Sequence, residues 1–577
     1  MVNRNVFSTS RGKLAPKADT KNRAGGLAYK MSDKHALVQY AVTNTFNNTY
    51  YARAEELLDD VAEICAKVDS KFIAQTAVYS RTKGYMKDMP AYLTAQLVGR
   101  GEIDLVKKIF PTTIDNGTQL KKFAQIIRSG VVGRKSFGSA TRNVIRSWLD
   151  DRRDDQLFRD AVGGDISLAD LIKMVHPKPA DKTRSAFYAY LLGKEYAFKN
   201  LPPIVQHYEN FKKGKAEEVP DVSFQYLTSL DIDTAVWKQI ARNAKWMMTR
   251  MNINTFMRHG VFEGKDGKEL IDIVANRLMN REEIKRARAF PYQLFAAYQN
   301  TEEAPPKIQL ALQEAMEIAC ENVEVFDGSV VVCPDVSGSM SSPVTGDRGS
   351  ATSKIRCIDV AALVAAVYLR KNPHTRVIPF EGDVVNIRLN PKDSIMTTAE
   401  KLAAIGGGST ECAAPLQLLN REKAEVDLII IVSDSGSWVR SRYRGMGRDA
   451  TPLMSEFSQL QARNPKVKMV LIDIEANKDS QAPDSDPAVL NIGGWSDTVF
   501  DVVNKFVAGN LSDDHIVEEV ENVFLGAEKE PRRVTQRLEH KATPKKKAKR
   551  TLRSLIRKVA TGGKSKKTSK AKAKKRK

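Results

Sequence analysis

The sequence predicts two folded parts: an all-α array of helices in the manner of an α-solenoid, and after it a doubly wound α/β domain. At 577 residues the chain is too long for one hydrophobic core. From Asp33 to about Asn322 apolar residues recur with helical spacing, and no segment has a convincing strand pattern. After Val323, short apolar runs alternate with helical stretches, which is typical of a parallel sheet covered on both faces.

The helical part, residues 31–325, shows the 3.6-residue period most clearly between Tyr51 and Val68. One face of that segment carries Ala54, Leu57, Leu58, Val61, Ile64 and Cys65. Further helices are expected near 90–100, 116–130, 139–150, 167–175, 183–193, 234–259, 268–288 and 306–322. Turn signals such as residues 115–117 separate them, and no fixed repeat length is visible. We therefore expect divergent, HEAT-like helical repeats.

The α/β part, residues 326–510, contains four apolar runs that predict buried strands. These strands are expected at 329–334, 375–380, 427–433 and 467–474, with helices at 355–371, 410–423, 452–463 and 496–508. In such sheets ligands bind outside the carboxyl ends of the strands.

The two ends of the chain have a different composition. Residues 1–30 are basic and rich in Gly, Ser and Asn, which predicts a flexible arm, and residues 511–540 have the mixed charge of a helical linker. Residues 541–577 contain eighteen Lys or Arg and no Asp or Glu, so 22 − 18 leaves a net charge of +4 for the rest of the chain. Such a tail is expected to be disordered and to bind nucleic acid nonspecifically through released counterions. Its first cationic cluster is Lys545, Lys546, Lys547, Lys549 and Arg550.

Composition argues against several classes of protein. No secretory signal and no apolar run of membrane-spanning length is visible. The five cysteines have no metal-ligand spacing, which indicates buried free thiols in a reducing compartment and favours the cytoplasm. No Cys–His pair or histidine cluster marks a nucleophile or a zinc centre, so we do not expect an enzyme.

A candidate metal site follows the first predicted strand. Asp335, Ser337 and Ser339 form an Asp-x-Ser-x-Ser loop, Thr410 follows a run of three glycines, and Asp434 ends another apolar run. Carboxylate and hydroxyl oxygens are the hard ligands that suit Mg²⁺. A capped strand-to-helix turn would explain the tripeptide alone but not all five residues in order. This set resembles the metal-ion-dependent adhesion site of von Willebrand factor A domains, which implies a bound divalent metal, with Mg²⁺ expected.

Three segments of the helical part are similar to the TROVE module of the Ro autoantigen family. They are Gly133–Gly138 with the following helix to Trp148, the stretch from Leu171 to Pro179 that contains His-Pro-Lys-Pro, and the segment Trp237–Asn254. The resemblance covers roughly residues 30–510 and suggests a bacterial or phage-type member with an added Lys-rich tail.

The resemblance implies that the helical repeats close into a ring whose ends the A domain joins. It also implies that the protein binds RNA, both a small non-coding RNA (a Y RNA) and misfolded RNA with a single-stranded 3′ end. By analogy it acts in RNA quality control or processing with an exoribonuclease as the implied partner, and we expect a monomer.

Cationic side chains of those segments are candidates for RNA contact, because cations bind the backbone phosphates of single-stranded RNA. They are Arg134, Lys135, Arg142, Arg146, Lys173, His176, Lys178, Lys238, Arg242, Lys245 and Arg250. For any single one of them a solvated helix face explains the charge better than RNA contact does, except for His176, where the two explanations are balanced. Trp237 and Trp246 fit a core better than a stacking platform.

Two other functions fit the sequence. One is a metal-dependent protein-interaction scaffold that the basic tail tethers to nucleic acid. The other is a metal-dependent accessory to an ATPase, which nothing in the helical part favours. RNA binding by the chain without its tail separates the first alternative from an RNA-binding ring.

Overall fold

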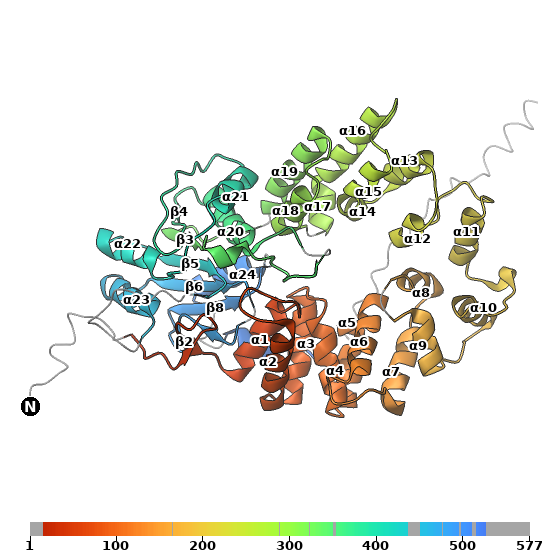
Figure 1. The fold of residues 1–577 in the computed structure, drawn as a ribbon, viewed down its shortest axis with the longest axis horizontal. Helices are drawn as coiled ribbons and strands as arrows, with labels where there is room; N and C mark the ends of the chain where they lie inside the picture. Colours follow the sequence, from red (N-terminus) through yellow and green to blue (C-terminus); the bar gives the residue numbers. More distant parts are fainter. Residues whose placement is uncertain are drawn as a thin grey trace, which may run out of the picture. The chain divides into compact units, whose positions relative to one another are not determined.

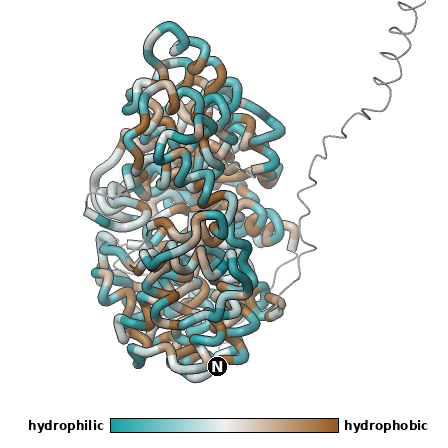
Figure 2. The backbone as a smooth tube through the Cα atoms, turned by 90° about the vertical axis from the view of Figure 1, so that its right-hand side faces the viewer, coloured by the Kyte–Doolittle hydropathy of each residue, from teal (hydrophilic) through white to brown (hydrophobic). Residues whose placement is uncertain are grey.

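The computed structural model describes residues 15–163, 166–287, 289–321, 323–349, 353–436, 450–475, 477–495, 498–509 and 515–526. Within residues 1–526, which form one compact unit, an array of helices is followed by an α/β domain (Figure 1). Apolar and polar residues alternate along most of the backbone, as expected for amphipathic helices (Figure 2). No helix in the described ranges has the length and apolar character that crossing a membrane would need.

The helical array is confirmed, and its helices mostly match the predicted segments. Its first half is α1 (Asp33–Thr43), α2 (Ala54–Lys67), α3 (Ser70–Thr82), α4 (Met89–Gly99), α5 (Ile103–Thr113), α6 (Gly117–Ser129), α7 (Gly138–Asp150), α8 (Asp154–Asp160), α9 (Leu168–Val175) and α10 (Lys182–Leu191). Its second half is η3 (Phe198–Asn200), α11 (Pro203–Lys212), α12 (Phe224–Thr228), α13 (Thr234–Asn243), α14 (Trp246–Met251), α15 (Ile253–Arg258), α16 (Gly267–Leu278), α17 (Arg281–Ala287), α18 (Pro291–Gln299) and α19 (Pro306–Cys320).

Many of these helices begin at a side-chain cap. The side chains of Asp69, Asn116, Ser167, Asp181 and Asp233 each accept a hydrogen bond from the backbone N–H three residues later. Such caps satisfy amide groups that have no partner within the helix. The short turns between helices are therefore specified locally, even though no repeat is visible in the sequence.

The single helix expected over 234–259 is instead three helices, α13, α14 and α15. The guanidinium of Arg277 donates to the carbonyls of Ala241, at 2.8 Å, and Arg242, at 2.6 Å, which lie at the end of α13. A side chain from α16 thus satisfies the carbonyls that a continuing helix would use. Trp237 and Trp246 are both buried in the core, as predicted.

The α/β domain has a five-stranded parallel sheet in the order β4-β3-β5-β6-β8. Its elements are β3 (Val330–Pro334), η4 (Gly338–Ser341), α20 (Cys357–Lys371), β4 (Arg376–Val377), α21 (Ile395–Ala403), α22 (Ala414–Glu422), β5 (Leu428–Ser433), α23 (Pro452–Arg463), β6 (Lys468–Asp473), β7 (Asp479–Ser480), β8 (Val489–Gly493) and α24 (Thr498–Val507). Alternate strand residues point to opposite faces. Val332 and Ile430 pack in the core with α20, α21 and α24, whereas Cys333 and Ile431 pack with α22 and α23. The doubly wound fold is therefore confirmed.

Strand β8 has no counterpart among the predicted strands, because Asn491 interrupts its apolar run. That amide is buried and satisfied: its Nδ2 donates to the Ala482 carbonyl at 3.0 Å, and its Oδ1 accepts from the Ser480 hydroxyl at 2.7 Å. All five cysteines are buried and none of them forms a disulfide, as predicted.

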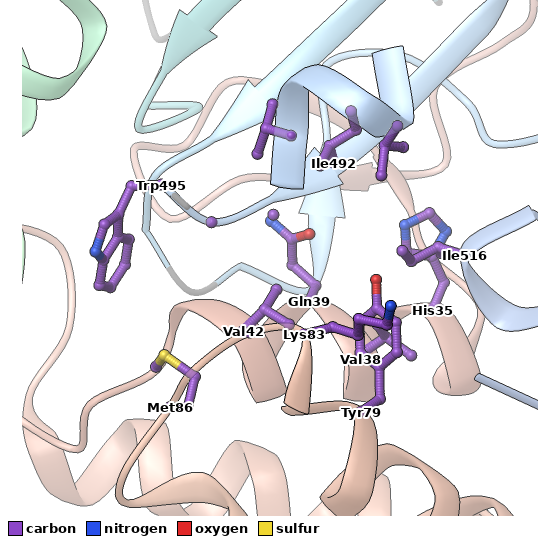
Figure 3. Close-up of a pocket in the computed structure, with 15 residues that line it drawn as sticks. His35, Val38, Gln39, Val42, Tyr79, Lys83, Met86, Ile492, Trp495 and Ile516 are labelled. Carbon is purple, nitrogen blue, oxygen red and sulfur yellow. The ribbon is translucent and has the colours of Figure 1, made fainter. Parts of the chain in front are cut away.

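Both ends of the helical array pack against the α/β domain. At the first end α1 lies against β8, and Gly493 lets them meet: a Cβ there would stand 2.3 Å from the Gln39 amide oxygen. Figure 3 shows this junction, with His35 and Gln39 of α1 opposite Ile492 and Trp495. At the other end α18 and α19 pack on α20 and α21, where the Glu317 carboxylate accepts from the Ile395 N–H at 2.8 Å. The helical path thus closes through the sheet domain.

Two predicted end segments differ from expectation. Within the predicted arm, β1 (Thr20–Lys21) pairs with β2 (Leu27–Lys30), and β2 pairs with β7, so residues 20–30 belong to the folded unit. The period-2 signal of two such short strands is too weak to read from sequence. Within the predicted linker, α25 (His515–Glu521) packs on α1 and α3 through buried Val517 and Val520. Residues 1–14 and 527–577 lie outside the described residues.

Candidate functional site

The five residues of the predicted metal site are all buried. Asp335, Ser337 and Ser339 follow β3, Asp434 follows β5, and Thr410 lies in the loop between α21 and α22. Parallel strands place their carboxyl ends at one edge of the sheet. The N–H of Asp335 donates to the Val432 carbonyl at 2.9 Å, which holds the two strand ends together. The glycine loop lies against them, because Gly407 donates to the Val336 carbonyl at 3.0 Å and Gly338 donates to the Gly408 carbonyl at 3.2 Å. These bonds tie the Thr410 loop to the Asp335 loop.

Hydrogen bonds within the site orient its oxygen atoms. Oδ1 of Asp335 accepts from the Ser337 N–H at 2.8 Å, and its Oδ2 accepts from the Ser433 hydroxyl at 2.6 Å. The hydroxyl oxygens of Ser337 and Ser339 lie 3.3 Å apart. Oδ1 of Asp434 accepts from the Gly436 N–H at 3.1 Å, whereas its Oδ2 is buried and has no hydrogen-bond partner among the described residues.

The electrostatics of this edge are unusual because four carboxyl groups are buried there without an ion pair to a described cationic side chain. Burial, reinforced by the charge of Asp434, raises the pKa of Asp335 to about 7. Burial also raises the pKa of Asp434 and brings those of Asp473 and Glu475 to about 8. Buried carboxylates are costly unless a cation or hydrogen bonds offset them.

The donor set fits a hard divalent cation. Two carboxylates and three hydroxyls supply only oxygen, and Asp434 offers a buried acceptor that the described residues do not use. In the described ranges no three side chains of His, Cys, Asp or Glu are placed to hold a metal ion together, and the two carboxylates here are accompanied by hydroxyls. Sequence reasoning missed Ser433, which holds Asp335 from the neighbouring strand, because a serine inside an apolar run carries no signal of its own.

The predicted RNA contacts of the first helical segment come together on one surface. It is made by the end of α6, by α7 and by the end of α9, and both α6 and α7 pack on α9. The Arg146 Nε donates to the Val175 carbonyl, and the Arg128 Nη1 contacts the Met174 sulfur at 3.0 Å. We call this surface the α6–α7–α9 cationic surface, and its exposed members are Lys135, Arg142, Lys173, His176 and Lys178.

Two details position these side chains. His176 ends α9 in the left-handed region, with φ +49°, and its N–H donates to the Ile172 carbonyl, so its ring lies exposed at the helix end. Arg134 and Arg146 are half-buried and donate to backbone carbonyls of Ser136 and Val175. The exposed cations are thus the ones best placed for phosphate contact.

Most of the cationic side chains predicted as RNA contacts in the second segment, Trp237–Asn254, are bound to other groups of the protein. Lys238 Nζ lies 2.6 Å from the Asp266 carboxylate, and Arg242 pairs with Glu269 and Asp266. Arg250 donates to the Gln293 carbonyl at 2.8 Å beside the Trp246 ring, and burial lowers its pKa. Lys245 is exposed. Three of these four cations therefore stabilise contacts between helices, and their role in RNA contact stays a prediction. The tail residues Lys545, Lys546, Lys547, Lys549 and Arg550 lie outside the described residues.

Comparison with known proteins agrees with this architecture. Residues 150–325 match the TROVE domain, and residues 329–507 match the Ro60 vWA domain. The chain is 21% identical over 532 residues to the RNA-binding protein RO60 of Deinococcus radiodurans, covering 85% of this chain and 96% of the relative. It is 23% identical over 504 residues to the RNA-binding protein RO60 of Caenorhabditis elegans, covering 81% of this chain and 75% of the relative. The crystal structure of the Deinococcus radiodurans RO (RSR) protein superposes with a TM-score of 0.57 at 17% identity, covering 83% of this chain and 100% of that chain.

The fold and these matches define a class of protein: a closed helical array that carries a von Willebrand factor A domain. Within that class the chain belongs to the Ro family, since it contains both the TROVE domain and the Ro60 type of vWA domain.

Proposed function

We propose that this protein binds RNA through its helical array and acts in RNA quality control or processing rather than as an enzyme. The observation that carries the proposal is the α6–α7–α9 cationic surface, whose exposed Lys173, His176 and Lys178 lie within residues 150–325, the part that matches the TROVE domain. Exposed cations on a folded surface bind phosphates, and structured RNA is recognised largely through its shape and backbone. The names of the two RO60 relatives support the same class of ligand.

The RNA ligands we propose are a small structured non-coding RNA of the Y RNA kind and misfolded RNA with a single-stranded 3′ end. An exoribonuclease is the proposed processing partner, and the protein is proposed to work as a monomer in the cytoplasm. These assignments extend the family membership, and the Lys-rich tail would add nonspecific affinity for nucleic acid.

The candidate metal site is proposed to hold Mg²⁺. Asp335, Ser337, Ser339, Thr410 and Asp434 would hold the ion, whose charge would offset the buried carboxylates of this edge. The metal would then hold the strand-end loops together at the place where the helical array begins. Calorimetric titration of the metal-free protein with Mg²⁺ tests this role.

Crosslinking of bound RNA in cells, followed by sequencing and mapping of the crosslinked residues, tests the RNA proposal. The expected result is a set of structured RNAs with unpaired 3′ ends, crosslinked within residues 134–178. Crosslinks confined to residues 541–577 would instead support the alternative, in which the body is a protein-interaction scaffold and the tail a tether.

A further inference from the structure

We infer that residues 44–52 of the helical array form a cap over the candidate metal site, and that Tyr51 is a member of that site. We call this segment, which connects α1 to α2, the α1–α2 cap. The inference rests on the proposed metal binding and goes beyond it, since it adds a residue from the other part of the molecule and predicts what the site excludes.

The first anchor of the cap is the loop that follows η4. Asn48 and Asp347 form an antiparallel bridge, in which the Asp347 N–H donates to the Asn48 carbonyl at 2.8 Å. The side chains of Thr45 and Asn47 both donate to the Thr345 carbonyl, at 2.7 and 2.8 Å. Gly346 permits the approach, because it has φ +71° and a Cβ there would stand 2.7 Å from Asn47.

The second anchor is the loop that follows β6. The cap places the Thr49 side chain and the Tyr50 backbone beside the buried carboxyl group of Glu475, where both act to lower its pKa against the larger effect of burial. A buried carboxyl group has no water to replace a lost partner, so separation of the cap from the sheet edge would leave Glu475 unsatisfied or expose it.

The third anchor is Tyr51 itself. Its hydroxyl lies beside Ser339 and near Asp434 and Asp335, so that burial and the charges of the two carboxylates raise its pKa. Its ring lies against Gly436, where a Cβ would stand 2.3 Å from the hydroxyl oxygen. Tyr51 therefore reaches the predicted ligand Ser339 and the loop that follows the predicted ligand Asp434.

These three loops follow β3, β5 and β6, so they all lie at the edge of the sheet where the metal ligands are. Bound Mg²⁺ usually keeps several waters, and a carboxylate from outside can replace one of them. Here the cap places the neutral hydroxyl of Tyr51 beside the predicted ligands, where an external carboxylate would otherwise approach. We therefore expect the loaded site to strengthen the junction between the array and the sheet domain, and to reject an external carboxylate while the cap is closed.

The test uses the full chain, with Mg²⁺ and acetate as probes. Tyr51→Ala opens the cap, Tyr51→Phe removes only the hydroxyl, and Tyr196→Ala is the matched control, since this 39% exposed tyrosine lies in the helical array outside the cap. Hydrogen exchange is measured over residues 44–52 with and without Mg²⁺, and Mg²⁺ affinity is measured by calorimetry with and without acetate. Thermal unfolding of each variant, with a midpoint close to that of the wild type, checks that the variants fold.

In the wild type, Mg²⁺ is expected to slow exchange of the cap at least tenfold, and Asp335→Ala should remove this protection. Acetate should increase Mg²⁺ affinity severalfold in Tyr51→Ala but not in the wild type or in Tyr196→Ala, and Tyr51→Phe should give a smaller increase. Mg²⁺ binding without protection of residues 44–52, or an equal acetate effect in the wild type, would overturn the cap alone. If the wild type binds no Mg²⁺, the proposed metal site fails and the cap's role at it fails as well.

Discussion

The hydroxyl of Ser433 donates to the carboxylate of Asp335 at 2.6 Å, across the ends of β5 and β3. Both groups are buried, so this bond fixes the rotamer of the first predicted metal ligand from the neighbouring strand. The Ser433 oxygen also accepts from the Ser435 N–H at 3.1 Å, which shapes the loop that carries Asp434. One serine thereby positions both carboxylates of the candidate site.

We predict that Ser433→Ala lowers Mg²⁺ affinity about tenfold, as is usual when a group that orients a metal ligand is removed. Calorimetry measures the affinity, and Ser458→Ala on α23, another buried serine, is the control. Unchanged affinity in Ser433→Ala would show that the loop backbone alone positions Asp335.

Asp335→Asn should lower Mg²⁺ affinity at least a hundredfold, because it removes one of the two carboxylates from the site. In EDTA the same change should raise the thermal midpoint, since an amide avoids the cost of a buried carboxylate. Asp327→Asn, an exposed residue before β3, is the matched control and should alter neither quantity. A lower midpoint in EDTA would contradict the electrostatic explanation.

The pairing of β2 with β7 should depend on pH through Asp479. Burial raises the pKa of this carboxyl group to about 6, from an ordinary value of 3.8. The folded protein therefore binds the proton more tightly than the unfolded chain, and charging Asp479 costs stability as pH rises from about 4 to 6. The penalty reaches at most ~3 kcal/mol.

We accordingly expect Asp479→Asn to be progressively more stable than the wild type as pH rises across this interval, with a constant difference above it. Thermal unfolding of both proteins at a series of pH values measures the difference. A constant difference between pH 4 and 7 would show that Asp479 titrates normally in the folded protein.

The α6–α7–α9 cationic surface should contribute directly to RNA affinity. Replacement of Lys135, Arg142 and Lys178 by glutamate should weaken binding of a structured RNA with a single-stranded 3′ end at least tenfold and flatten its salt dependence. The control makes the same charge change at exposed lysines elsewhere in the array, Lys71, Lys194 and Lys265. An equal loss in both variants would mean that net charge, and not this surface, determines binding.

Much of the fold could be predicted from sequence because its signals are local. Helical periodicity and capping residues such as Asp69 and Asn116 indicate the helices, and four apolar runs indicate four of the five strands of the parallel sheet. What could not be predicted depends on long-range contacts. The end of α13 is set by Arg277 from another helix, and β8 contains an asparagine whose partners lie in the preceding loop.

The same distinction applies to the candidate site. Asp335, Ser337, Ser339, Thr410 and Asp434 follow recognisable strand ends or glycines, so sequence order alone groups them. Tyr51 lies nearly three hundred residues earlier in a segment without any metal-binding pattern, and only the closure of the helical array brings it to Ser339. Lys238 and Arg242 show the opposite case, since a basic helix face gives no sign of the acidic partners on α16 and its preceding turn.

RNA binding by the chain that ends at residue 540 tests the central claim most directly, because it separates the folded body from its basic tail. Titration of a structured RNA that has a single-stranded 3′ end, against the same RNA with a fully paired end, measures both affinity and preference. We predict that the shortened protein still binds and prefers the unpaired end, with a shallower salt dependence than the full chain. Loss of all binding with the tail would contradict an RNA-binding helical array.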